Sequence, residues 1–233
     1  MNILHYFTIL VNLIFHLSFI FVCIIVFIMK YIIHRGITNN YIKENSYCAI
    51  KRALNDINSS GVEFDIRLTK DNKIVLSHDS INIENSNYTD IVKKKYLNTL
   101  DNILSINTSK ILLIDIKVRN NYKRFAKEII KCLSTTKNKN IYLASFHKKI
   151  IRYLKKRTNY KLGYITFKNT KNNNHFEVIN FFTLNKNNIN KYPNKEIFLW
   201  TIHNKKEEKI VLDKFSNTIY YIIKDSYDSF TSI

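Results

Sequence analysis

Eight short apolar runs, several of them separated by stretches of helical periodicity, most constrain what this chain of 233 residues can fold into. Apolar positions at three- and four-residue spacing predict helices between the runs. Strands that alternate with helices indicate a parallel α/β barrel or a doubly wound sheet, and eight is the strand number of the barrel. The predicted strands are residues 30–34, 61–68, 111–117, 141–146, 161–166, 178–182, 197–202 and 219–224, and the predicted helices are residues 45–57, 122–133, 148–157 and 205–215.

Two polar segments rich in Asn and Lys interrupt this alternation. Residues 167–177 are too short for a full helix between two strands and are predicted to form a loop. Residues 185–195 are predicted to hold at most a turn or two of helix.

One predicted hairpin carries a conspicuous set of polar residues. Apolar and polar residues alternate along residues 61–68, so Glu63 and Asp65 point to the same face, about 7 Å apart. A turn follows, and a second apolar run, Ile74 to Leu76, ends at His78. The hairpin is therefore expected to carry two carboxylates on one arm and a histidine at the end of the other.

The N-terminal segment is the most hydrophobic part of the chain. Residues 7–29 contain no charged side chain across 29 − 7 + 1 = 23 positions, which as a helix would span roughly 34 Å, enough to cross a bilayer. Residues 1–29 are therefore predicted to hold a transmembrane helix, and residues 30–233 to form one domain. The cations that follow, Lys30, Arg35 and Lys43, predict a single-pass membrane protein with this domain in the cytoplasm. The alternative is that translation starts at Met29, which would give a soluble cytoplasmic protein.

The net charge is +19, from 37 Lys and Arg against 18 Asp and Glu. Such a balance favours anionic partners such as phosphates, lipid head groups or nucleic acid. The whole chain is also enriched in Lys, Ile and Asn, which accounts for much of the total. No dense Lys/Arg block and no recognisable nucleic-acid module is present, so no nucleic-acid partner is expected.

Chemistry in an α/β barrel takes place at the C-terminal ends of the strands, and several predicted strand ends here carry polar residues. Glu63, Asp65 and Asp115 are three carboxylates that could hold one hard divalent cation through oxygen. Arg35 and Lys117 could neutralise phosphoryl oxygens.

Two histidines complete this inventory. His34 ends the first predicted strand and His78 ends the hairpin. They could serve as general base and general acid on opposite sides of a phosphorus atom. Together with the carboxylates and cations, they indicate phosphodiester chemistry.

The order of these motifs resembles the glycerophosphodiester phosphodiesterase family, whose members are phospholipase C-like TIM barrels. The resemblance runs from about Lys30 to Asp225. It rests on the motifs His34-Arg35-Gly36, Glu44-Asn45, Glu63-Phe64-Asp65, Leu68-Thr69-Lys70-Asp71, His78-Asp79, Asp115-Ile116-Lys117, Ser145-Phe146, Trp200-Thr201 and Ile223-Lys224-Asp225.

The resemblance implies a TIM (β/α)8 barrel with an added β-hairpin after strand 2. It implies hydrolysis of glycerophosphodiesters to glycerol 3-phosphate and an alcohol, with one divalent metal ion, Mg²⁺ or Ca²⁺. In the family mechanism a glycerol hydroxyl attacks the phosphorus, and water then opens the cyclic phosphate. The roles carried over are metal ligation by Glu63, Asp65 and Asp115, acid and base catalysis by His34 and His78, phosphate binding by Arg35 and Lys117, and a substrate pocket lined by Glu44 and Trp200.

Four departures from the family pattern leave alternatives open. Lys43 replaces a proline, Lys224 replaces a threonine, and the insertion after the hairpin is cut to residues 80–98. Asp115 stands where the family usually has Glu, a feature shared with sphingomyelinase D-like phospholipases. The alternatives are a phospholipase D-like phosphodiesterase acting on lysophospholipids, and a non-catalytic barrel that binds anionic lipid or phosphate.

Overall fold

The computed structural model describes residues 30–79, 82–95, 97–167, 173–184, 195–215 and 221–226. The predicted transmembrane helix at residues 7–29 lies outside these ranges, as does nearly all of the segment 185–195. A search of the described ranges finds no helix with the length and hydrophobicity needed to span a bilayer.

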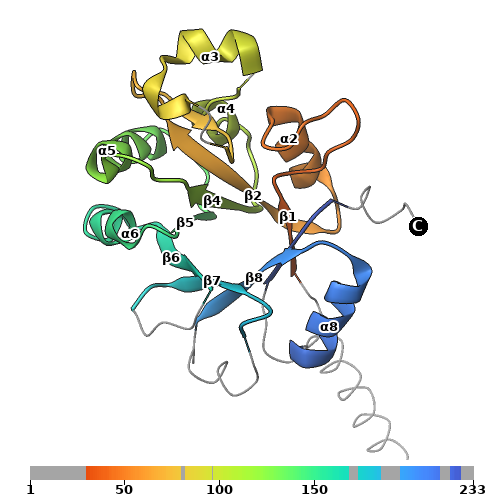
Figure 1. The fold of residues 1–233 in the computed structure, drawn as a ribbon. Helices are drawn as coiled ribbons and strands as arrows, with labels where there is room; N and C mark the ends of the chain where they lie inside the picture. Colours follow the sequence, from red (N-terminus) through yellow and green to blue (C-terminus); the bar gives the residue numbers. More distant parts are fainter. Residues whose placement is uncertain are drawn as a thin grey trace, which may run out of the picture.

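Eight parallel strands close into a barrel (Figure 1). Neighbouring strands pair in chain order, and β1 pairs with both β9 and β2, which closes the sheet on itself. The barrel is therefore confirmed over the doubly wound alternative. Its strands are β1 (Lys30–His34), β2 (Ser59–Leu68), β4 (Ile111–Ile116), β5 (Ile141–Ser145), β6 (Lys161–Thr166), β7 (Phe176–Asn180), β8 (Glu196–Ile202) and β9 (Tyr221–Lys224).

Helices cover the outside of the barrel at the four predicted places. They are α2 (Tyr47–Asn55), α5 (Tyr122–Leu133), α6 (Lys148–Lys155) and α8 (Lys205–Phe215). The apolar face of α5 buries Phe125, Ala126 and Ile129, and Asn121 caps the helix by accepting a hydrogen bond from the backbone N–H of Arg124.

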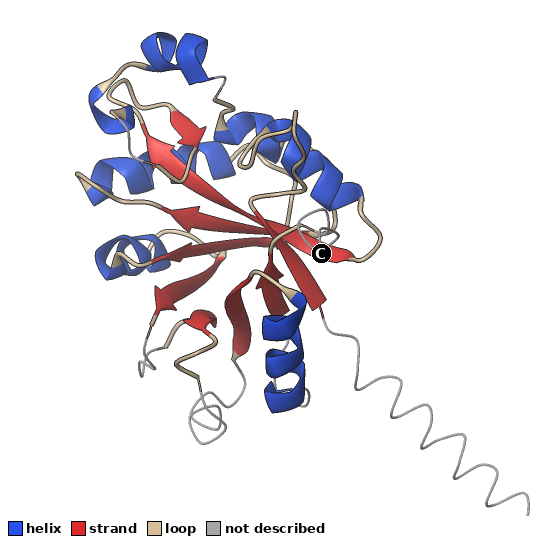
Figure 2. Cartoon of the chain, turned by 45° about the vertical axis from the view of Figure 1, so that its right-hand side comes forward, coloured by secondary structure: helices blue, strands red, loops and turns tan. Residues whose placement is uncertain are grey.

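The hairpin arm is β3 (Ile74–Leu76), which pairs antiparallel with the end of β2. It is followed by a 3₁₀ turn, η1 (Ile83–Asn85), and by α3 (Tyr88–Lys95) and α4 (Leu100–Leu104), none of which the sequence pattern predicts. Figure 2 shows these elements gathered beside the hairpin. Val75, Ile83 and Ile91 form a small core of their own. The shortened insertion is thus a folded cap on the hairpin.

The N-terminal half of the barrel interior is filled by aromatic side chains. Phe176 and Phe198 pack against Tyr142 with ring centroids 5.2 and 5.5 Å away, and Phe198 stacks on Tyr221 at 4.3 Å. A Cβ at Gly163 would lie 2.5 Å from the Phe176 ring, so glycine makes room for this packing. Phe176 also explains why β7 begins two residues before its predicted start: this buried ring belongs to the strand.

Candidate active site

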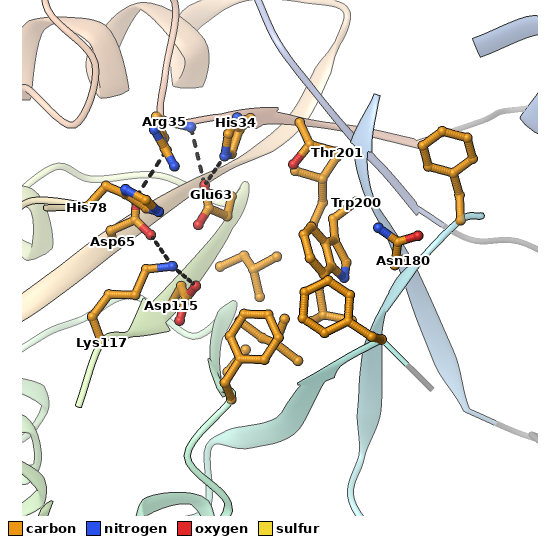
Figure 3. Close-up of a pocket in the computed structure, with 18 of the residues that line it drawn as sticks. His34, Arg35, Glu63, Asp65, His78, Asp115, Lys117, Asn180, Trp200 and Thr201 are labelled. Carbon is orange, nitrogen blue, oxygen red and sulfur yellow. Dashed lines mark hydrogen bonds and ion pairs between the residues drawn. The ribbon is translucent and has the colours of Figure 1, made fainter. Parts of the chain in front are cut away.

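The C-terminal ends of the strands surround a cavity of about 440 Å³ (Figure 3). Most of the residues predicted to form the site meet there, although they come from five different strands or strand ends. Those that line the cavity are His34, Arg35, Glu63, Asp65, His78, Asp115, Lys117 and Trp200.

Three buried carboxylates form the acidic part of the site. Glu63 and Asp65 project from β2, and Asp115 on β4 lies opposite Asp65 in the parallel register. Each side chain offers one oxygen, and these oxygens lie within 4.8 Å of one another. The residues are only 6%, 1% and 5% exposed, so this cluster is enclosed by the protein.

The nearby cations Lys117 and Arg35 only partly compensate the negative charge of the three carboxylates. Burial, together with the charges of Asp65 and Asp115, raises the pKa of Glu63 well above its ordinary value. Burial and the nearby Asp65 charge raise the pKa of Asp115 to about 6. Burial acts in the same direction on Asp65, but Lys117 and Arg35 outweigh it and lower the pKa of that carboxyl.

The donor set fits a hard divalent cation. Asp115 Oδ1 is buried and has no hydrogen-bond partner among the described residues. Burying such an oxygen without a partner is costly, and a cation would remove that cost. All three side chains supply the oxygen atoms that Mg²⁺ and Ca²⁺ prefer.

Two cations flank the carboxylates. Lys117 Nζ lies 2.6 Å from Asp115 Oδ2 and 3.0 Å from Asp65 Oδ1. Arg35 Nε lies 3.2 Å from Asp65 Oδ2 on the other side. Glu44 is not among the residues that line the cavity; it accepts two hydrogen bonds from one guanidinium nitrogen of Arg35, at 2.9 and 3.1 Å.

A left-handed turn after β1 directs Arg35 to this place. Arg35 has φ of 54° and Gly36 has φ of 89°. A Cβ at Gly36 would meet the carbonyl carbon of Ala49 at 2.5 Å. The H-R-G motif therefore needs its glycine both for the backbone angle and for the close approach of α2.

The two predicted histidines face the cavity, and each has a different carboxylate partner. His34 Nδ1 lies 2.8 Å from Asp225 Oδ1, and its Nε2 lies 3.9 Å from Glu63. His78 Nδ1 lies 3.1 Å from Asp79. Arg67 donates two hydrogen bonds, at 3.0 and 2.6 Å, to the backbone carbonyl of His78, which fixes the end of the hairpin.

Asp225 and His203 are site residues to which sequence reasoning gave no role. The second oxygen of Asp225 lies 2.7 Å from His203 Nδ1, so one carboxylate joins both histidines. In the sequence, Asp225 stands out only as the last residue of a motif. No sequence pattern indicates that His203 lines the cavity. The contact between His34 and Asp225 spans 191 residues and requires β9 to pair with β1.

Aromatic side chains form the opposite wall of the cavity. The Trp200 ring lies edge-on to Phe167 and Phe146, with centroids 5.2 and 5.8 Å away. Figure 3 shows Trp200 and Asn180 on the side away from the carboxylates, Arg35 and Lys117. One end of the cavity thus suits an anionic group and the other an apolar one.

The segment that carries the first motifs matches a known family model. Residues 34–86 match the glycerophosphoryl diester phosphodiesterase family. No curated protein matches the chain.

Solved structures with the same fold cover most of the chain. A glycerophosphodiester phosphodiesterase from Thermotoga maritima is 21% identical, with a TM-score of 0.68 over 84% of this chain and 94% of that one. The enzyme from Parabacteroides distasonis is 20% identical, with a TM-score of 0.71 over 85% and 93%. A phosphodiesterase from Oleispira antarctica, solved in complex with the product sn-glycerol-3-phosphate, is 14% identical, with a TM-score of 0.72 over 84% and 92%.

These structures show the fold, and the family match covers the segment from His34 through the hairpin. The resemblance of this chain to the glycerophosphodiester phosphodiesterase family, predicted from its motifs, is therefore confirmed.

Proposed function

We propose that the protein is a metal-dependent glycerophosphodiester phosphodiesterase, which hydrolyses its substrate to glycerol 3-phosphate and an alcohol. The observation that carries this proposal is the cluster of three buried carboxylates, whose oxygens lie within 4.8 Å of one another in a cavity that is also lined by two cations and three histidines. The Oleispira antarctica phosphodiesterase, which has the same fold, was solved with sn-glycerol-3-phosphate. That product supports the proposed substrate class.

Glu63, Asp65 and Asp115 would hold one Mg²⁺ or Ca²⁺ ion. Such an ion supplies positive charge that polarises a phosphoryl oxygen and stabilises the charge that develops there. Arg35 and Lys117 lie on the two sides of Asp65, so they can bind the remaining phosphoryl oxygens with charge-assisted hydrogen bonds.

His34 would act as the general base. Because the Asp225 carboxylate accepts a hydrogen bond from Nδ1–H, Nε2 is left to take a proton from the glycerol hydroxyl that attacks the phosphorus. His78 would protonate the oxygen of the departing alcohol. The P–O bond to that alcohol breaks as the new one forms, and a water molecule then opens the cyclic phosphate with the two histidines in reversed roles.

The test is hydrolysis of glycerophosphocholine and glycerophosphoethanolamine by the whole chain, with Mg²⁺, with Ca²⁺ or with EDTA. We expect metal-dependent release of glycerol 3-phosphate. His34→Ala should lower kcat by roughly 10² to 10⁴, the usual contribution of a positioned acid or base. Asp115→Asn should lower both activity and metal affinity. A folded chain that binds metal but releases no glycerol 3-phosphate from either substrate would contradict the proposal.

A lysophospholipid is the second candidate substrate, because the wall opposite the carboxylates is apolar and aromatic. Lysophosphatidylcholine in the same assay separates the two classes. Release of choline or phosphate esters from this lipid alone would favour the phospholipase D-like alternative. A folded chain that turns over none of these substrates and binds no metal would favour the non-catalytic barrel that binds anionic lipid or phosphate.

A further inference from the structure

Helices α5 and α6 lie side by side on the outside of the barrel, as Figure 1 shows, and together carry a strongly basic surface. We call it the α5–α6 surface and define it by six exposed cations. Two adjoining hollows of about 550 and 530 Å³ run between the helices, and each is lined by several of these cations. The six residues are Lys123, Lys127, Lys149, Arg152, Lys156 and Arg157.

The charge of this region exceeds what chain-wide composition explains. Residues 121–158 contain 12 of the 37 Lys and Arg residues but only one of the 18 acids, Glu128. The segment therefore carries 12 − 1 = 11 of the 19 net charges in 158 − 121 + 1 = 38 residues. The helix α8 has an ordinary balance, with Glu207 and Glu208 among its lysines. A uniform enrichment in Lys along the chain would not explain why residues 121–158 contain so few acidic residues.

No described carboxylate forms an ion pair with the six cations. Across the described ranges, none of them lies within ion-pair distance of a carboxylate. Their mutual repulsion is a cost of folding that is relieved when an anionic partner approaches. Sequence reasoning missed this surface because the cations are spread along two helices.

The aromatic residues between the helices of the α5–α6 surface already have partners within the protein. Arg157 covers the face of the Tyr153 ring at 3.8 Å from its centroid, and Tyr122 contacts the same ring edge-on at 6.2 Å. Proteins that bind single-stranded nucleic acid use free aromatic faces between their cations. This surface therefore fits a layer of anionic head groups better than a nucleic-acid strand.

An exposed aromatic pair lies at the cavity rim next to α6. Phe146 lies two residues before the first residue of α6 and is 44% exposed, and Phe167, which follows β6, is 55% exposed. The two rings stack with centroids 5.5 Å apart. Because α5 and α6 follow β4 and β5, their N-terminal ends also lie on the side of the cavity mouth. Aromatic side chains beside a cluster of cations are typical of surfaces that insert into the membrane interface.

We propose that the α5–α6 surface, with Phe146 and Phe167 at its rim, docks on membranes that contain anionic phospholipids, and that docking brings the cavity mouth to the lipid surface. Each Lys or Arg near such a membrane strengthens binding by roughly fivefold. The proposal rests on charge and exposure and does not depend on the proposed hydrolase activity.

The test is lysine footprinting of the full chain, because it reports on each residue whether or not residues 7–29 insert into the bilayer. The chain is mixed with vesicles of phosphatidylcholine alone or with added phosphatidylglycerol, treated with an amine-acetylating reagent, and analysed by mass spectrometry. We expect Lys123, Lys127, Lys149 and Lys156 to react roughly tenfold more slowly on the anionic vesicles only. High salt should abolish the protection, and Lys209 on α8 should be unaffected.

A matched pair of variants keeps the test specific. The triple variant Lys127→Gln, Arg152→Gln, Lys156→Gln removes three charges from the α5–α6 surface, and Lys205→Gln, Lys206→Gln, Lys209→Gln removes three from α8. Protection of Lys123 and Lys149 should need roughly 10²-fold more anionic lipid in the first variant and the same amount in the second. Equal reactivity on both vesicle types would overturn the proposal. So would protection by a single-stranded oligonucleotide without protection by anionic vesicles.

Discussion

Asp225 is the residue on which the orientation of two histidines depends. Its carboxylate oxygens lie 2.8 Å from His34 and 2.7 Å from His203, and these imidazoles hold its pKa below the usual value although burial opposes this. We predict that Asp225→Asn lowers kcat by roughly 10²-fold, because an amide can donate to Nδ1 and thereby favour the wrong tautomer of His34. We expect kcat to fall and the pH dependence of kcat to change, with little change in KM.

The matched control is Asp213→Asn on α8, which removes the same charge outside the cavity lining. His203→Gln separates the two contacts of Asp225, since it leaves the bond to His34 in place. If Asp225→Asn changed KM alone, a positioning role for Asp225 toward His34 would be excluded.

Asp115 makes metal binding depend on pH. Its pKa of about 6 in the folded protein lies above the ordinary 3.8. Below about pH 6 a proton occupies the carboxylate, so a metal must displace it, and we predict that affinity for Mg²⁺ or Ca²⁺ falls up to about tenfold per pH unit there. Calorimetric titration between pH 5 and about pH 7 measures this. An affinity that is flat across the range would contradict the prediction.

The same group makes the metal-free protein less stable as the pH rises. Because the folded pKa is raised, the folded state holds the proton more tightly than the unfolded state. The contribution of Asp115 to stability is therefore present below 3.8 and is lost as the pH rises through about 6. Asp115→Asn should flatten this part of the curve of unfolding temperature against pH, and saturating metal should reverse its slope.

The hairpin element depends on Arg67. This side chain donates to the carbonyl of His78 and pairs with Glu84 at 2.7 Å, and both partners of that pair are largely buried. We predict that Arg67→Met lowers the free energy of unfolding by about 3 kcal/mol, since it leaves the buried Glu84 carboxylate unpaired. It should also lower kcat, because His78 loses its backbone support. Urea unfolding measures the change in stability, and the activity assay on the folded variant measures the change in kcat.

Arg67→Lys is the informative control for this prediction. A lysine retains the charge opposite Glu84 but cannot reproduce the two-pronged contact with the carbonyl of His78. Stability should therefore recover more than kcat does. Equal recovery of both would mean that the carbonyl contact does not position His78.

The elements that the sequence predicts are those with strong periodicity. Residues 122–133 and 205–215 are helices with the predicted bounds, because each buries an apolar stripe against the barrel. The sequence does not predict the short helices α3 and α4. Five to eight residues span only one or two helical turns, so their apolar periodicity is weak, and their contacts depend on the hairpin. Glu63, Asp65 and Asp115 could be grouped before the structure was known because parallel neighbours align their strand ends.

At the scale of the whole molecule, barrel closure assembles what no local pattern shows. The link from His34 through Asp225 to His203 exists only because β9 returns to β1. The α5–α6 surface likewise requires two helices to be placed side by side. Sequence reasoning could list the charged residues in both cases, but distances between elements far apart in the chain are set by topology.

The predicted transmembrane helix and the proposed docking of the α5–α6 surface would attach the whole molecule to a membrane in two different ways. We predict that the full chain stays in the membrane fraction under high salt, because the 23 uncharged residues would form a span whose insertion salt does not weaken. A chain that starts at Met29 should be released by high salt, since only the electrostatic contact of the α5–α6 surface would remain. Its thermal unfolding should be unchanged, because the strand pairing that closes the barrel begins at Lys30. Release of both chains by high salt would show that the predicted transmembrane helix is wrong, whereas retention of both would mean that the barrel domain has a salt-resistant membrane contact of its own.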